Sequence, residues 1–281
     1  MFEVLFHNNM ICHAVEAMLF ASAGCGILSI LITQMKISSI GFTLAHGAFA
    51  GSAVGMFLHL PETIVAIISS VIVGAILGPL ADKARMPIDT ILGVLFGSLM
   101  AIAVFFSAWM VQLGQGYESP TSLLFGNVIS LYREEIYELG IVMLIILVFV
   151  VIFYKEISAM IFNMKIAEIA GIKTKLVMYS VLFMIAITVS LTLPRVGGLL
   201  LYVWLVTPSA IAYQFCGTLK QMMITAPVIA VIISLGSTIA AFHFELPIAP
   251  FTAVVFSLIF LASVAFSPKR RILKISNINN S

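Results

Sequence analysis

Charged residues are scarce in this chain of 281 residues, since only 9% are Asp, Glu, Lys or Arg and 62% are hydrophobic. Soluble domains carry about 25% charged residues, so this composition excludes a soluble globular domain. The mean hydropathy of +1.17 indicates a polytopic helical membrane protein. The first apolar run lacks preceding basic residues and is followed by many more, so no cleavable signal is expected.

Several motifs that carry chemistry are absent from the sequence. The three cysteines, Cys12, Cys25 and Cys216, are scattered, so neither a disulfide framework nor a zinc knuckle is expected. No HExxH or GxSxG stretch occurs, and no run of arginines suggests a voltage sensor. Because GxxxxGK[ST] is missing as well, this chain does not itself cradle ATP phosphates. If ATP is used, another chain supplies the ATPase.

Apolar runs long enough to cross a bilayer recur along the chain, because a spanning helix needs about 20 largely apolar residues. No linker between these runs could hold a soluble domain, so residues 1–281 are expected to form one all-α transmembrane domain of about eight to nine spans. The expected spans are 14–33, 40–59, 63–80, 88–111, 136–154, 176–193, 198–216, 222–242 and 249–266.

Lysine and arginine indicate the orientation, because they accumulate on the cytoplasmic side of a membrane. With the basic tail "SPKRRILK" inside, alternating spans leave only Arg133 and Arg195 outside. We therefore expect the N-terminus outside and the C-terminus in the cytoplasm. The residues then placed inside are Lys36, Lys83, Arg85, Lys155, Lys165, Lys173, Lys175, Lys220, Lys269, Arg270, Arg271 and Lys274.

The longest cytoplasmic connection, residues 155–175, has apolar residues at close to helical spacing. This pattern predicts one short amphipathic helix, which Gly171 can terminate. Such a helix could lie along the membrane surface or dock into a groove on a partner.

The stretch "IGFTLAHGAFAGSAVG" (residues 40–55) places a histidine and three glycines within a span. Gly47, Gly51 and Gly55 share one helix face, where small residues allow a second membrane helix to pack closely. His46 lies about 100° around the helix from Gly47. An ionisable side chain in a span generally faces the bundle interior or a wet path. His46 is therefore either a pathway residue or a neutral histidine hydrogen-bonded to a neighbouring helix.

Three further polar residues are candidates for the pathway. Asp89 follows Pro87 at the start of a span, where it could cap the helix or take part in transport. His243 and Glu245 lie near the outer face, where they could touch an incoming cation or belong to an ordinary solvated loop.

Three stretches together resemble one family. "SSIGFTLAHGAFAGSAVG" is similar to a span G-D-x-x-x-H-x-x-x-x-G, "FNMKIAEIAGI" to a coupling segment F-D-x-x-x-A-x-x-x-G-I, and "VGGLLLYVWLVTPSAIA" to V-G-x-L-L…P-x-x-x-A. The matching residues are Gly41, His46, Gly51, Phe162, Ala167, Gly171, Ile172, Val196, Gly197, Leu199, Leu200, Pro208 and Ala212. Weaker similarities surround Asp89, Asn127 and Glu245. The chain thus resembles the permease subunit of the zinc, manganese and iron class of ABC transporters.

The resemblance implies a homodimer of two permease copies with a pathway between them, in the lipid of a prokaryotic cytoplasmic membrane. Two cytoplasmic ATPase subunits would bind ATP and the coupling segments, and an extracytoplasmic solute-binding protein would deliver the metal. This chain would be no enzyme, bind no cofactor of its own and have no nucleic-acid partner. His46 would be the metal ligand on the pathway. The residues expected at the ATPase are Phe162, Asn163, Ala167, Glu168 and Gly171.

The sequence departs from the family pattern at four positions. Glu245 stands for the usual Asp, and Asn127 lies where some relatives carry Asp. Phe42 stands where the family has Asp, one helical turn from His46, and phenylalanine cannot ligate a metal. Asn163 replaces the Asp of the coupling segment, although its amide can still cap a helix. The leading hypothesis is a permease for divalent zinc, manganese or iron. An alternative is a permease for a metal chelate or other small solute. An ion-coupled carrier would need buried acidic residues, which this chain almost lacks.

Overall fold

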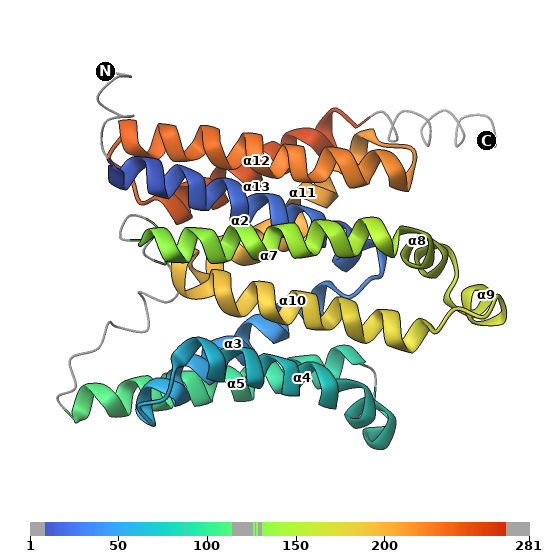
Figure 1. Ribbon diagram of the computed structural model, residues 1–281, viewed down its shortest axis with the longest axis horizontal. Helices are drawn as coiled ribbons and strands as arrows, with labels where there is room; N and C mark the ends of the chain where they lie inside the picture. Colours follow the sequence, from blue (N-terminus) through green and yellow to red (C-terminus); the bar gives the residue numbers. More distant parts are fainter. Residues whose placement is uncertain (1–8, 87, 114–125, 127, 129–130, 268–281) are drawn as a thin grey trace.

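The computed structural model describes residues 9–86, 88–113, 126, 128 and 131–267, and its long elements are all helices (Figure 1). This confirms the prediction of an all-helical membrane protein. The helices are α2 (Asn9–Gln34), α3 (Ser38–Phe57), α4 (Glu62–Ala84), α5 (Ile88–Gln112), α7 (Arg133–Ile152), α8 (Tyr154–Phe162), α9 (Met164–Ile169), α10 (Thr174–Val196), α11 (Gly198–Phe215), α12 (Leu219–His243) and α13 (Ile248–Ala265).

Among the described residues, eight helices are long and apolar enough to cross a membrane: α2, α3, α5, α7 and α10 to α13. The predicted span 63–80 lies within α4, for which the described residues Glu62 to Leu77 form an apolar helical stretch. The count of eight to nine spans is therefore confirmed. In Figure 1 the long helices run side by side, and α8 and α9 project beyond their ends.

Burial is uneven across the bundle. In α2, 78% of the residues in the apolar stretch are buried, because this helix packs against α7, α11 and α12. The corresponding share is only 17% for α5 and 22% for α7. Apolar helices that stay uncovered in this way are soluble only in lipid or against another apolar surface, so the structure agrees with a multi-pass membrane protein.

The glycines of α3 lie where this helix meets α4. A Cβ atom added to Gly51 would lie 2.6 Å from the Cβ of Ser69 and 2.7 Å from the carbonyl oxygen of Val65. Added Cβ atoms at Gly47 and Gly55 would come within 3.2 Å and 3.1 Å of valine side chains on α4. The two helix backbones approach so closely that only glycine fits at position 51.

A buried arginine joins the end of α10 to the start of α7. The guanidinium of Arg195 donates to a carboxylate oxygen of Glu138 and lies 3.5 Å from a carboxylate oxygen of Glu135. It also donates to the carbonyl oxygen of Leu191 at 2.7 Å. Arg195 itself is only 7% exposed, so its charge is held by these partners rather than by water.

We expect Arg195→Gln to lower the free energy of unfolding by about 1 to 2 kcal/mol, because both carboxylates keep part of their solvent contact. The measurement is thermal unfolding of the purified protein in detergent. Arg133→Gln is the control, because Arg133 is an exposed arginine at the start of α7. Its Nε atom contacts the imidazole of His13 at 3.3 Å instead of a carboxylate. Equal melting temperatures for the two variants would contradict a stabilising role for Arg195.

Candidate functional site

His46 and Phe42 are half-buried positions one turn apart on α3, a helix that is otherwise largely buried. The Nδ1 atom of His46 lies 2.9 Å from the carbonyl oxygen of Phe42. A carbonyl oxygen can only accept a hydrogen bond, so in the neutral imidazole this contact places the proton on Nδ1 and leaves a lone pair on Nε2. Within the part of the chain that the structure describes, no hydrogen bond reaches Nε2, which is therefore available to a ligand.

Aromatic rings from three helices surround the imidazole. The ring centroid of His46 lies 4.4 Å from that of Phe42 and 4.5 Å from that of Phe96 on α5, both edge to face. Phe42 in turn stacks on Phe96 at 5.0 Å and contacts Tyr202 of α11 edge-on at 4.6 Å. The side chain one turn before His46 thus joins an aromatic cluster instead of supplying a second polar ligand.

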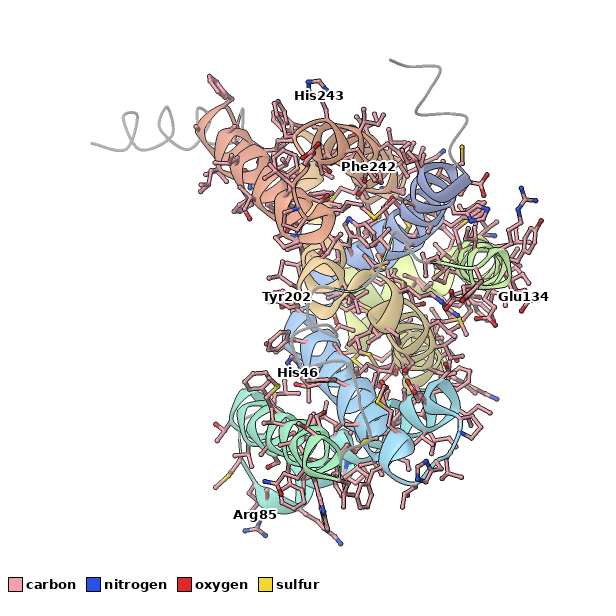
Figure 2. All side chains as sticks on the ribbon, turned by 90° about the vertical axis from the view of Figure 1, so that its left-hand side faces the viewer. His46, Arg85, Glu134, Tyr202, Phe242 and His243 are labelled. Atoms are coloured by element: carbon pink, nitrogen blue, oxygen red, sulfur yellow. The ribbon has the colours of Figure 1, made fainter. Side chains whose placement is uncertain are left out.

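A cavity of about 320 Å³ adjoins this cluster, between α3, α10 and α11. Figure 2 shows His46 and Tyr202 on the same side of the molecule, where its outline narrows. Among the described residues, His46 and Tyr202 are the lining residues with polar side chains, and none of the described lining residues is charged. The lining residues are Phe42, Ala45, His46, Phe49, Leu193, Gly198, Leu199, Tyr202 and Val203.

Metal ligands do not cluster in the described part of the chain, where no group of three or more His, Cys, Asp or Glu side chains could hold an ion together. Among the described residues, the strong ligand that one chain offers a metal at this cavity is the Nε2 atom of His46. Structural zinc sites usually have about four protein ligands and catalytic ones about three, so this arrangement suits transient contact better than permanent binding.

The other predicted pathway residues are not brought together with His46. Figure 2 places His243 at a different edge of the molecule, pointing away from the bundle. Glu245 follows two residues later, exposed, in the connection between α12 and α13. Asp89 lies in the first turn of α5, but its side chain is outside the described part, as is the whole of Asn127.

Residues 155–175 form two helices, so the prediction of one amphipathic helix is wrong. The chain is extended at Asn163, with φ −163° and ψ 114°, and this residue separates α8 from α9. The amide oxygen of Asn163 accepts from the backbone N–H groups of Lys165 at 3.0 Å and Ile166 at 3.2 Å. The capping expected of this amide is thus present, and it starts a new helix rather than continuing the first.

The short helices around Asn163 expose large apolar side chains. Phe162 is 83% exposed, Ile166 55% and Ile169 88%; we call these three residues the coupling surface. Ala167, in contrast, is buried against the bundle. Gly171 follows α9 with a φ of +85°, a left-handed conformation that glycine adopts without strain and that ends the helix.

Glu168 has a partner within the chain. One of its carboxylate oxygens accepts a hydrogen bond from the hydroxyl of Thr174 at 2.7 Å. Thr174 is the first residue of α10 and is buried. The bond therefore connects α9 to the start of α10, so Glu168 is engaged inside this chain even though the residue itself is exposed.

Sequence reasoning missed the aromatic residues Phe96 and Tyr202 in the cluster around His46. It also missed that Arg195 pairs with carboxylates of α7. Phe96 and Tyr202 lie far from His46 in sequence, within apolar runs that have many aromatic residues. Arg195 carried a usable signal, because an arginine inside an apolar run needs a carboxylate partner. No comparable signal marks the two aromatic residues.

The eight described helices that are long and apolar enough to cross a membrane define a multi-pass membrane protein, with a half-buried imidazole beside a cavity. The sequence matches the ABC 3 transport family over residues 7–267. The chain belongs to this family, whose members are membrane subunits of transporters.

Relatives of the chain are named as transport proteins for different metals. The chelated iron transport system membrane protein YfeD of Yersinia pestis is 24% identical, over 90% of this chain and 84% of the relative. The manganese transport system membrane protein MntC of Halalkalibacterium halodurans is 24% identical, over 97% and 92%. The zinc uptake membrane protein ZnuB of Haemophilus influenzae is 24% identical, over 94% and 98%.

The fold also has a solved counterpart. A chain in the structure of PsaBC from Streptococcus pneumoniae in complex with Fab superposes with a TM-score of 0.87. The match covers 98% of both chains at 20% sequence identity. At this identity the likeness concerns the fold alone, and it extends to the arrangement of the whole helix bundle.

Proposed function

We propose that this chain is the membrane-spanning subunit of an ATP-driven importer that carries zinc, manganese or iron across a prokaryotic cytoplasmic membrane. The observation that carries the proposal is the Nε2 atom of His46, a free imidazole nitrogen in the middle of a spanning helix beside a cavity. Imidazole is a ligand for all three metals. Membership of the ABC 3 transport family, with relatives named for these metals, supports the choice of cargo.

A second copy of the chain completes the pathway in this proposal. His46 is half-buried and Tyr202 is 36% exposed, so the cavity opens at the side of one chain instead of being enclosed by it. A homodimer that buries this side would enclose the cavities of both copies and bring a second imidazole. One imidazole alone offers a metal too few ligands to replace its water.

ATP acts through a separate subunit in this proposal, and the chain binds no cofactor itself. The coupling surface would fill an apolar groove on a cytoplasmic ATPase, in the manner of an amphipathic helix in a groove. This requires α8 and α9 to be cytoplasmic, with the N-terminus outside and the C-terminus inside. An extracytoplasmic solute-binding protein would then deliver the metal at the opposite end of the bundle, where His243 and Glu245 lie.

His46→Gln tests the pathway assignment. We expect ATP-driven metal uptake to fall at least about tenfold, because the amide retains the polarity of the site but ligates metals poorly. The measurement is uptake of zinc, manganese and iron, counted separately, into proteoliposomes containing this chain, its ATPase and its binding protein. His59→Gln is the matched control, since His59 is exposed in the connection after α3. Undiminished uptake by His46→Gln would make His46 a packing residue.

A further inference from the structure

We propose that the metal reaches His46 already bound to a small aromatic or apolar organic ligand, and not as a hydrated ion. The inference rests on the proposed function and specifies the chemical form of the cargo. It follows from the ligands that the cavity offers, from the chemistry of its walls and from its size.

The number of protein ligands is too small for a bare ion. The cavity offers the Nε2 atom of His46, and the phenol of Tyr202 is the other polar side chain in its lining. Even in a homodimer two imidazoles would be present, while zinc takes about four ligands. The remaining positions must be filled by water or by ligands that travel with the metal.

The walls disfavour water in those positions. The rings of Phe42 and Phe96 pack against the imidazole at 4.4 and 4.5 Å, and among the described lining residues no carboxylate is present to balance the charge of a dication. Stripping or burying the hydration shell of such an ion without compensating ligands costs many kcal/mol. A metal whose other positions are occupied by an organic ligand presents an apolar exterior instead, and spreads its charge over more atoms.

Aromatic ligands fit these walls best. Phe42 and Tyr202 both line the cavity and already contact each other edge to face, so their rings can extend the same contacts to a planar ligand. A positively charged complex gains further from lying over aromatic faces. The neutral imidazole then supplies one coordination bond and fixes the orientation of the complex.

The size of the cavity limits the ligand to a small molecule. Its volume of about 320 Å³ is at the lower end of the range of small-molecule sites, about 300 to 1,000 Å³. A bidentate chelator of a few fused rings suits this volume, whereas a large multidentate carrier would not. The inferred cargo is thus a metal with one small chelator and at least one position open to imidazole.

The probe for the experiment is the one-to-one complex of zinc with 1,10-phenanthroline, an aromatic chelator that leaves positions open on the metal. The complete transporter, with its ATPase, is placed in lipid nanodiscs and titrated calorimetrically with zinc chloride, with the zinc complex and with phenanthroline alone. Empty nanodiscs correct for partition into lipid. We expect the wild type to bind the complex at least about tenfold more tightly than zinc chloride.

Two substitutions at one position separate ligand chemistry from packing. Phe42→Asp places a carboxylate one helical turn from His46, so we expect tighter binding of zinc chloride and loss of the preference for the complex. Phe42→Leu keeps an apolar side chain without adding a ligand. It should weaken binding of the complex by a few fold, from the lost ring contacts, and leave zinc chloride weakly bound.

Coordination by His46 has its own readout. The visible absorption of the corresponding cobalt(II) complex should change when an imidazole nitrogen enters the coordination sphere, and His46→Gln should abolish this change. Wild-type protein that binds zinc chloride as tightly as the complex, or does not bind the complex, overturns the proposal. If the ATPase nevertheless co-purifies with the chain, the importer stands and only the form of the cargo is wrong; absence of the ATPase would instead refute the proposed function.

Discussion

Ile169→Asp and Phe162→Asp should each abolish ATP-driven uptake while the permease remains inserted and folded. These side chains are 88% and 83% exposed on the coupling surface, so neither is needed for the packing of the chain itself. A carboxylate in an apolar groove would be desolvated without a partner. Loss of a central apolar contact of this kind costs about 2 kcal/mol or more of binding free energy, which weakens ATPase binding by roughly 30-fold.

The measurement is co-purification of the ATPase with tagged permease, followed by uptake into proteoliposomes. Lys220→Asp is the matched control, because Lys220 is exposed in the first turn of α12 and lies outside the coupling surface. Lys220→Asp changes the charge next to the connection between α11 and α12, and we expect the ATPase to stay bound to this variant. Normal uptake by Ile169→Asp would show that the ATPase binds elsewhere.

Gly51→Leu should prevent stable assembly of the helix bundle. The first atom of the new side chain would already lie 2.6 Å from the Cβ of Ser69 and 2.7 Å from the carbonyl oxygen of Val65, well inside contact distance. The α4 backbone must move to accommodate it, which separates α3 from its neighbour. Overpacking of this severity costs about 3 kcal/mol or more, a large part of the stability of a small domain.

Gly236→Leu provides the comparison, because a Cβ at Gly236 on α12 would meet nothing within 4 Å. Both substitutions place the same side chain in a helix, so helix propensity cancels between them. The fraction of monodisperse protein after heating in detergent should collapse for Gly51→Leu and stay near the wild type for Gly236→Leu. Similar profiles for the two variants would mean that the α3–α4 contact is not tight in the membrane.

The helices could be predicted from the sequence because each membrane span is marked by its own local pattern of apolar and charged residues. Each one needs a long apolar run, and the charged residues fall between the runs. The helix break at Asn163 could not be predicted in this way. The apolar spacing continues through it from Ile157 to Ile169, and only the capping bonds of the Asn163 amide decide that the backbone extends there.

The candidate site was predictable only in part. His46 stands out because an ionisable residue in a span is unusual. Its surroundings depend on Phe96 and Tyr202, which reach it through the packing of α5 and α11 and which resemble many other aromatic residues in this chain. Hydrophobic pattern identifies which residues enter a membrane, whereas contacts between distant spans are fixed by helix packing that the pattern does not record.

The hydrogen bond between Glu168 and Thr174 has a mechanical consequence. It ties α9 to the first residue of α10, a helix of 23 residues whose far end brings Leu193 to the cavity beside His46. An α-helix of this length is about 34 Å long and behaves as a stiff rod. If the ATPase displaces the coupling surface, α10 is therefore the element through which that displacement would reach the Leu193 side of the cavity.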